Sequence, residues 1–126
     1  MNTNEQDKIK SFTNLTSWKE AHKLALEVYK LTKVFPNEEK YVLIDQMRRC
    51  AVSISSNIAE GFARRSRKEK INFYFTAKGS LTELQNQLII SRDLSYTKEE
   101  LFMKVAKQTV VVHKLINGLV KSAQSK

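Results

Sequence analysis

Residues 46–69 read QMRRCAVSISSNIAEGFARRSRKE, and this stretch joins a helical pattern to polar side chains and a block of positive charge. Apolar residues recur in it at spacings of three and four, which predicts one apolar face of an α-helix. Gly61 is typical of the residue that follows a helix end. The stretch therefore predicts a helix that ends near Glu60 and leads into a basic turn. The apolar face consists of Ile44, Met47, Ala51, Ile54 and Ile58.

Composition places the chain among small helical proteins. It has 126 residues, 41% of them hydrophobic and 28% charged, with three glycines and one proline. These values favour one globular domain of long helices with short connections. We expect a flexible arm at 1–12, a domain at 13–122 and a frayed end at 123–126. The single cysteine excludes an internal disulfide, and the chain shows no signal or membrane-spanning segment, so we expect a cytoplasmic protein.

Four helices are predicted, at 17–35, 38–60, 66–94 and 97–122. Three of them open with a Ser or Thr followed three residues later by Glu, the pattern of a capping box. Short connections make successive helices antiparallel neighbours, so the expected fold is an all-α, up-down-up-down four-helix bundle. The core face of the third helix is predicted to be Ala77, Leu81, Leu84 and Leu88. The capping pairs are Ser17–Glu20, Ser66–Glu69 and Thr97–Glu100.

Three apolar triplets, at 73–75, 88–90 and 110–112, cover more of a helix than one core face requires. Successive helical residues lie about 100° apart, so each triplet spans roughly 200° of the circumference. Something must cover the surplus, and self-association is the simplest explanation. The alternative is a few scattered exposed apolar side chains, which monomers tolerate.

A polar stripe runs along the second helix and faces a similar stripe on the third. It can be a hydrogen-bonded network that fixes helix register or subunit pairing, or it can line a site. We favour the structural role, because the stripe contains no pair of nucleophile and base. We expect Glu60 and Glu83 to meet Arg48 or Arg49. The predicted network comprises Gln46, Arg48, Arg49, Ser53, Asn57, Glu60, Ser80 and Glu83.

Positive charge is the strongest functional signal. The net charge is +9, from 22 Lys and Arg against 13 Asp and Glu, which favours contact with polyanions. The basic block after Gly61 lies in a predicted turn, and arginine is a good phosphate ligand. Lysines on helix faces can also be ordinary solvated surface. The candidate nucleic-acid-binding residues are Arg64, Arg65, Arg67, Lys68, Lys107, Lys114 and Lys121.

Signals of catalysis are weak. His22 and His113 are isolated, and neither has a metal-ligand partner at helical spacing. Cys50 is more typical of a small packed residue than of a nucleophile. The chain has no glycine-rich phosphate loop. We therefore expect no enzymatic activity, no catalytic residues, no cofactor and no metal.

The 46–69 stretch, with AKGSLTELQNQL at 77–88 and LTSWKEAHKLALEVYKLTKVFP at 15–36, resembles the four-helix-bundle proteins encoded in 23S rRNA intervening sequences. The resemblance implies a cytoplasmic bacterial protein that forms a homopentameric barrel with a central channel. Related accessory proteins of diversity-generating retroelements are basic, bind nucleic acid and associate with a reverse transcriptase. Relatives often carry Pro where this chain has Ser55, so the second helix is expected to run straighter here.

Together these patterns predict an oligomeric, non-enzymatic protein that binds RNA or DNA through phosphates, as an accessory to a larger nucleic-acid enzyme. The alternative is a pentameric scaffold that binds another protein and has no nucleic-acid role. Binding at a membrane surface is less favoured, because assembly would hide the exposed apolar faces that it needs.

Overall fold

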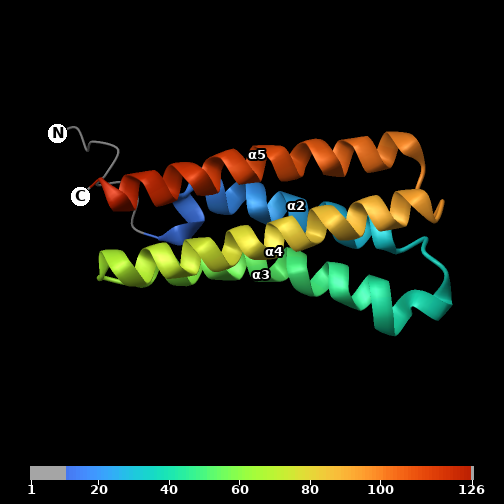
Figure 1. Cartoon of the computed structure of the whole chain (residues 1–126), viewed down its shortest axis with the longest axis horizontal. Helices are drawn as coiled ribbons and strands as arrows, with labels where there is room; N and C mark the ends of the chain where they lie inside the picture. The colour runs from blue at the N-terminus through green and yellow to red at the C-terminus, as the bar shows by residue number, and fades with distance from the viewer. Residues whose placement is uncertain (1–10, 126) are drawn as a thin grey trace.

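Four α-helices run antiparallel along one long axis in the computed structural model, which describes residues 11–125 (Figure 1). No strand occurs in these residues, so the predicted all-α class and the order of the four helices are confirmed. A short 3₁₀ turn, η1 (Phe12–Asn14), precedes the bundle. The remaining 1–10 of the predicted arm lies outside the described residues. The helices are α2 (Thr16–Thr32), α3 (Asp45–Ala63), α4 (Arg67–Asp93) and α5 (Glu99–Gln124).

The helices pack as a closed square around one core. The main contacts join α2 to α3, α3 to α4, α4 to α5 and α5 back to α2. The predicted core face of α4 is buried at all four positions. Each fully buried aliphatic side chain contributes about 1.5–3 kcal/mol relative to leaving it in water. The largest fully buried side chains are Leu24, Leu31, Met47, Ile54, Ile58, Leu81, Leu84, Leu88 and Ile116.

The connection between α2 and α3 is less regular than the sequence predicted. Instead of one helix from residue 38, a 3₁₀ turn (η2, Asn37–Glu39) and a π-helical turn (η3, Lys40–Ile44) precede α3. A π turn shifts the phase of the residues that follow it. Here Ile44 is buried while Tyr41 stays 83% exposed. The change of helix type thus sets the apolar stripe of α3 against the core.

Gly61 does not follow the end of a helix, as the sequence predicted, but lies inside α3, which continues to Ala63. Its φ is not positive, so conformational freedom does not explain the glycine. A Cβ atom at this position would lie 2.6 Å from Tyr74 Cε1 and 3.0 Å from Phe73 Cβ. Gly61 therefore allows α3 and α4 to approach each other closely just before the turn.

One of the three predicted helix caps is present. Ser66 is the N-cap of α4, and its hydroxyl accepts a hydrogen bond of 3.3 Å from the Glu69 backbone N–H. Leu15 and Lys98 take the cap positions of α2 and α5, with no side-chain cap. Ser17 is instead buried in the first turn of α2. The predicted caps at Ser17 and Thr97 were wrong, because packing placed each helix start one or two residues away.

The α4–α5 connection contains a strained residue. Ser95 has φ of 62°, the left-handed conformation that favours glycine. Its N–H donates to the Arg92 carbonyl, and the Tyr96 N–H donates to the Ser91 carbonyl, which is the Schellman pattern at a helix end. α5 then runs to Gln124, two residues beyond its predicted end.

The three apolar triplets divide between core and surface. Tyr74, Leu88 and Val112 are buried, which accounts for one member of each triplet. Five of the other six members remain exposed, including Phe75 at 48%, Ile89 at 45% and Val110 at 48%, while Phe73 is half-buried. The chain therefore carries the surplus apolar surface that the sequence predicted.

Candidate nucleic-acid interface

The basic block occupies the turn between α3 and α4, at the end of the bundle that also holds the start of α2 and the end of α5 (Figure 1). Arg64 is the C-cap of α3, and its N–H donates to the Gly61 carbonyl. Ser66 caps α4. Both contacts use a backbone N–H as the donor, so neither occupies the charged side chains of the turn. The four exposed cations of the turn are Arg64, Arg65, Arg67 and Lys68.

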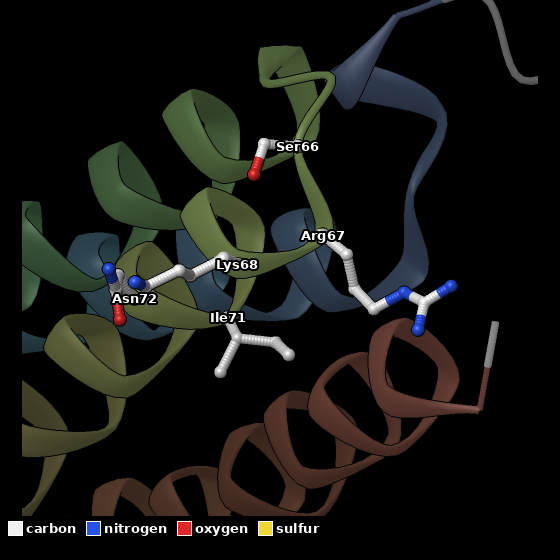
Figure 2. Close-up of a pocket in the computed structure, with 5 residues that line it drawn as sticks. All are labelled: Ser66, Arg67, Lys68, Ile71 and Asn72. Atoms are coloured by element: carbon white, nitrogen blue, oxygen red, sulfur yellow. The ribbon is translucent and has the colours of Figure 1, made fainter.

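A shallow hollow lies beside this turn. It is lined by side chains of the first turns of α4, and in Figure 2 the Arg67 side chain extends toward the end of α5. The Lys68 side chain extends in the other direction, toward the side of the view where Asn72 lies. Such an open site can accept a phosphate at the surface but cannot enclose a small molecule. Its lining residues are Ser66, Arg67, Lys68, Ile71 and Asn72.

Two neighbouring cations are used differently. The Arg64 guanidinium lies over the Phe73 ring, 4.7 Å from its centroid, which fixes its stem while leaving it exposed. Lys70 is half-buried, and its Nζ donates to the carbonyls of Gly61 at 3.3 Å and Phe62 at 2.8 Å. Burial lowers the pKa of Lys70. Lys70 therefore holds the end of α3. This role was not predicted from the sequence, although the helix dipole favours a cation near a helix C-terminus.

The candidate lysines of α5 do not all join this cluster. Lys107, Lys114 and Lys121 are exposed and seven residues apart, so they form one row along the helix. Lys121 lies in the last turn of α5 and therefore at the basic end. Lys107 lies in the other half of α5. The candidate nucleic-acid-binding residues thus form a cluster at the basic end of the bundle, and the lysines of α5 form a row that leads away from this cluster.

Acidic residues gather at the opposite end of the bundle. Glu38 and Glu39 lie in the α2–α3 connection, and Glu99 and Glu100 open α5. Both ion pairs found within residues 11–125, Arg49–Asp45 at 2.9 Å and Arg92–Asp93 at 2.8 Å, lie outside the basic turn. Among the described residues, therefore, no carboxylate pairs with the cations of the α3–α4 turn.

The predicted polar network forms in part. The Ser53 and Ser80 hydroxyls share a hydrogen bond of 2.8 Å between α3 and α4. Asn57 Nδ2 donates to the Ser53 carbonyl at 2.8 Å and to its hydroxyl at 3.1 Å. Only the Ser53–Ser80 bond joins the two helices and so ties their register, whereas the Asn57 bonds lie within α3. Gln46, Glu60 and Glu83 are instead exposed on the outside of the seam.

The two arginines of the predicted network contact other groups within the chain. Arg48 Nε donates to the Thr32 hydroxyl at 2.9 Å, and its guanidinium lies 4.6 Å from the Tyr29 ring centroid. Arg49 pairs with Asp45 on its own helix. Within a single chain, therefore, the expected contacts of these arginines with Glu60 and Glu83 do not form. Arg48 contacts α2 instead, and Arg49 contacts the start of α3.

Cys50 is buried at the α3–α4 seam. Burial, aided by the nearby Glu83 carboxylate, raises the pKa of the Cys50 thiol to about 11. The thiol therefore stays protonated at neutral pH and is a poor nucleophile. Residues 11–125 also contain no cluster of three or more His, Cys, Asp or Glu side chains that could hold a metal ion. None of the helices in this range has the length and apolar character needed to cross a bilayer.

This geometry defines a basic, antiparallel four-helix bundle with a charged turn at one end, and comparison with known proteins supplies the family. Residues 13–118 match the family model described as 23S rRNA-intervening sequence protein. The chain belongs to this family, so the resemblance seen in the sequence is confirmed.

A solved structure shares the fold. It is that of a protein of unknown function from the S23 ribosomal protein family of Bacteroides thetaiotaomicron, with a TM-score of 0.77 and 24% sequence identity. The match covers 83% of this chain and 95% of that one. No curated protein matches the chain. The family model establishes the family and the solved structure supports the fold, and the solved structure is that of a protein of unknown function.

Proposed function

We propose that this chain is a non-enzymatic, oligomeric protein that binds RNA or DNA through phosphates, as an accessory factor to a larger nucleic-acid enzyme in the cytoplasm. The observation that carries the proposal is the separation of charge along the bundle. The α3–α4 turn holds four exposed cations with only two exposed carboxylates, Glu60 and Glu69, close in sequence. The other end holds Glu38, Glu39, Glu99 and Glu100 together with the exposed Lys33 and Lys40. Such a field orients the protein on a polyanion.

The chemistry of the basic end suits phosphate contacts better than base recognition in a groove. Arginine presents a planar group of donors that matches phosphate oxygens, and Arg64, Arg65 and Arg67 supply three of them within four residues. The turn presents no free helix that could enter a major groove. Contacts of this kind position a nucleic acid and make its affinity depend steeply on salt.

Self-association is supported by the outer surface of α4. Residues 71–90 contain only two charged residues, Lys78 and Glu83, in a chain that is 28% charged. Exposed Phe75, Ile89 and Ile90 lie in this segment. Depletion of charge together with exposed aromatic and aliphatic side chains is the composition of an interface core. The groove between α4 and α5, lined by Ile89, Phe102 and Val110 among others, continues the same surface.

A second apolar surface lies across the bundle. Tyr29, Tyr41, Val42 and Val52 are exposed on α2, on α3 and in their connection, opposite the α4–α5 side. Two different surfaces on opposite sides favour a head-to-tail interface, which closes into a ring. We propose a ring of five, the number that the family resemblance implies. Such a ring would repeat the basic turn around one rim and multiply its contacts with phosphates.

Fluorescence anisotropy tests the binding proposal. Labelled single-stranded RNA, duplex RNA and duplex DNA are titrated with the protein over a series of salt concentrations. We expect the logarithm of the affinity to fall linearly with the logarithm of salt, with a slope of several units. Absence of binding at low salt would refute it and leave the alternative, a scaffold for another protein.

Native mass spectrometry tests the assembly. We expect a species of five times the 14.6 kDa chain mass. Ile89→Glu places a charge on the apolar surface of α4 and should yield smaller species with unchanged helix content, because Ile89 is not part of the core. Gln124→Glu, at an exposed position near the end of α5, is the matched control. A wild-type protein that remains monomeric at micromolar concentration contradicts the ring.

A further inference from the structure

Three aromatic rings form a stack at the start of the bundle. The Phe12 and Trp18 ring centroids are 5.2 Å apart with the planes at 68°, an edge-to-face contact. The Trp18 and His22 rings lie nearly parallel, with centroids 4.8 Å apart and planes at 13°. Phe12 comes from η1, while Trp18 and His22 are one turn apart on α2. The sequence did not predict the stack, because it depends on how η1 folds back on α2.

One end of the stack packs against the protein, and the other end is exposed to solvent. Phe12 and Trp18 are half-buried, and Trp18 packs against the core. His22 is exposed and forms no part of the core. Trp18 therefore has an ordinary structural role, whereas the parallel position of the His22 ring adds little to the stability of the fold. A flat ring held in place by a neighbour and open to water is suited to receive another flat ring.

The stack lies at the basic end. The start of α2 shares that end with the α3–α4 turn (Figure 1), and η1 contacts α3, whose last residue precedes Arg64. Lys19 and Lys23 lie on either side of His22 in sequence, and both are exposed. Cations and an exposed ring thus occur together, which is the combination found where proteins bind single-stranded nucleic acids.

We propose that His22, stacked on Trp18, is a platform for an unpaired base, and that the nucleic acid bound by this protein is therefore single-stranded. The inference rests on the proposed function and specifies its substrate class. Histidine is among the side chains on which splayed bases stack, and a base within a strand offers its face only when it is unstacked from its neighbours. In a duplex both faces of every base inside the helix are covered by stacked neighbours, and only the two terminal pairs have a free face. The phosphates on either side of the stacked base would contact Lys19, Lys23 and the arginines of the turn.

Trp18 provides a direct readout, because it is the only tryptophan in the chain. The probes are a ten-nucleotide thymidine strand, an abasic strand of the same length and a duplex of the same length, each titrated at low salt. We expect the thymidine strand to quench Trp18 fluorescence and to bind more tightly than the abasic strand. The abasic strand should bind through phosphates without quenching. The duplex should bind without the quenching that a stacked base produces.

Substitution of His22 isolates the platform. His22→Ala should weaken binding of the thymidine strand roughly 5- to 150-fold, the range that stacking of one base supplies, and leave the abasic strand unaffected. His22→Tyr should restore the affinity, because it retains a flat ring. His113→Ala, which removes the other histidine from α5, is the control and should change neither.

The outcomes separate this inference from the proposed function. Equal affinities for the thymidine and abasic strands, with no effect of His22→Ala, would overturn the platform and leave phosphate binding intact. Tighter binding of the duplex than of either single strand would also overturn it. If none of the three probes binds at low salt, both the platform and the proposed function fail.

Discussion

At the end of the bundle where α3 turns into α4, the arginines form no ion pair within the described residues, whereas at the opposite end Arg92 and Glu39 have partners within the chain. Arg92 pairs with Asp93 at 2.8 Å, and the Tyr96 hydroxyl donates to Glu39 at 2.6 Å. At the basic end, Arg64 and Arg65 form no ion pair within residues 11–125, although the exposed Glu60 and Glu69 are close to them in sequence. At the acidic end the polar side chains tie the connections between helices together, whereas at the basic end the arginines of the turn have no ion-pair partner in the described chain.

The largest effect is expected from removing the exposed charge. Arg64→Ala combined with Arg65→Ala should lower the affinity for single-stranded RNA about tenfold or more, and reduce the magnitude of the salt slope by about 2. Lys33→Ala combined with Lys40→Ala removes the same charge from exposed positions at the other end and is the matched control. Anisotropy over a salt series measures both. Equal losses from the two pairs would mean that net charge, rather than its position, governs binding.

The packing beneath the basic turn gives the next effect. Gly61→Ala should destabilise the fold by about 1–3 kcal/mol, because the added Cβ meets the buried Tyr74 ring at 2.6 Å. Gly118→Ala adds the same group where nothing lies within 4 Å, so it should stabilise α5 by up to about 1 kcal/mol. Urea unfolding measures both. If the two substitutions change stability in the same direction, the close approach of α3 and α4 at Gly61 is not a constraint.

A smaller effect is expected at the opposite end. Ser95→Gly should stabilise the fold by about 1 kcal/mol, because Ser95 adopts the left-handed conformation with φ of 62°. Ser125→Gly is the control, because Ser125 ends α5 with φ of −81° and gains nothing from glycine. Thermal unfolding of the two variants should therefore shift the midpoint upward for Ser95→Gly alone.

The smallest effect concerns pH. The hydrogen bond to Glu39 raises the pKa of Tyr96 above its usual value of 10.0. The folded state thus retains the phenol proton longer than the unfolded state, and the stability that this bond contributes is present below pH 10 and lost as pH rises above it. Wild type should therefore exceed Tyr96→Phe in stability at neutral pH, and the difference should shrink above pH 10. Urea unfolding of both proteins at neutral pH and above pH 10 measures this difference in stability. A difference that does not change with pH would show that the hydrogen bond to Glu39 is not its cause.

The caps show how far sequence reasoning reached. The Ser66 cap was predicted correctly because a short turn with charged neighbours leaves the helix few alternative starts. The same pattern at Ser17 and Thr97 failed, since the apolar contacts of Leu15 and of Leu101 with the core moved each helix start. Local capping energies of about 1 kcal/mol are easily outweighed by the burial of one large side chain.

The candidate site divides in the same way. The basic block could be found from the sequence because its residues are consecutive, and a turn exposes consecutive charges. The role of Lys70 and the contact of Phe12 with Trp18 could not be found, because the partners lie on other elements. The ring geometry of Trp18 and His22 depends on side-chain orientations that a spacing of four permits but does not determine.

By itself, the sequence determined the number and order of the helices, the residues of the core and the sign of the charge, because helical periodicity and composition are local properties. The packed structure was needed to show that Gly61 lies within α3 against Tyr74, that Arg48 contacts Thr32 of α2, and that cations and an aromatic stack share one end of the bundle. Each of these depends on contacts between segments distant in sequence. Such contacts form only when the helices pack, so no local pattern encodes them.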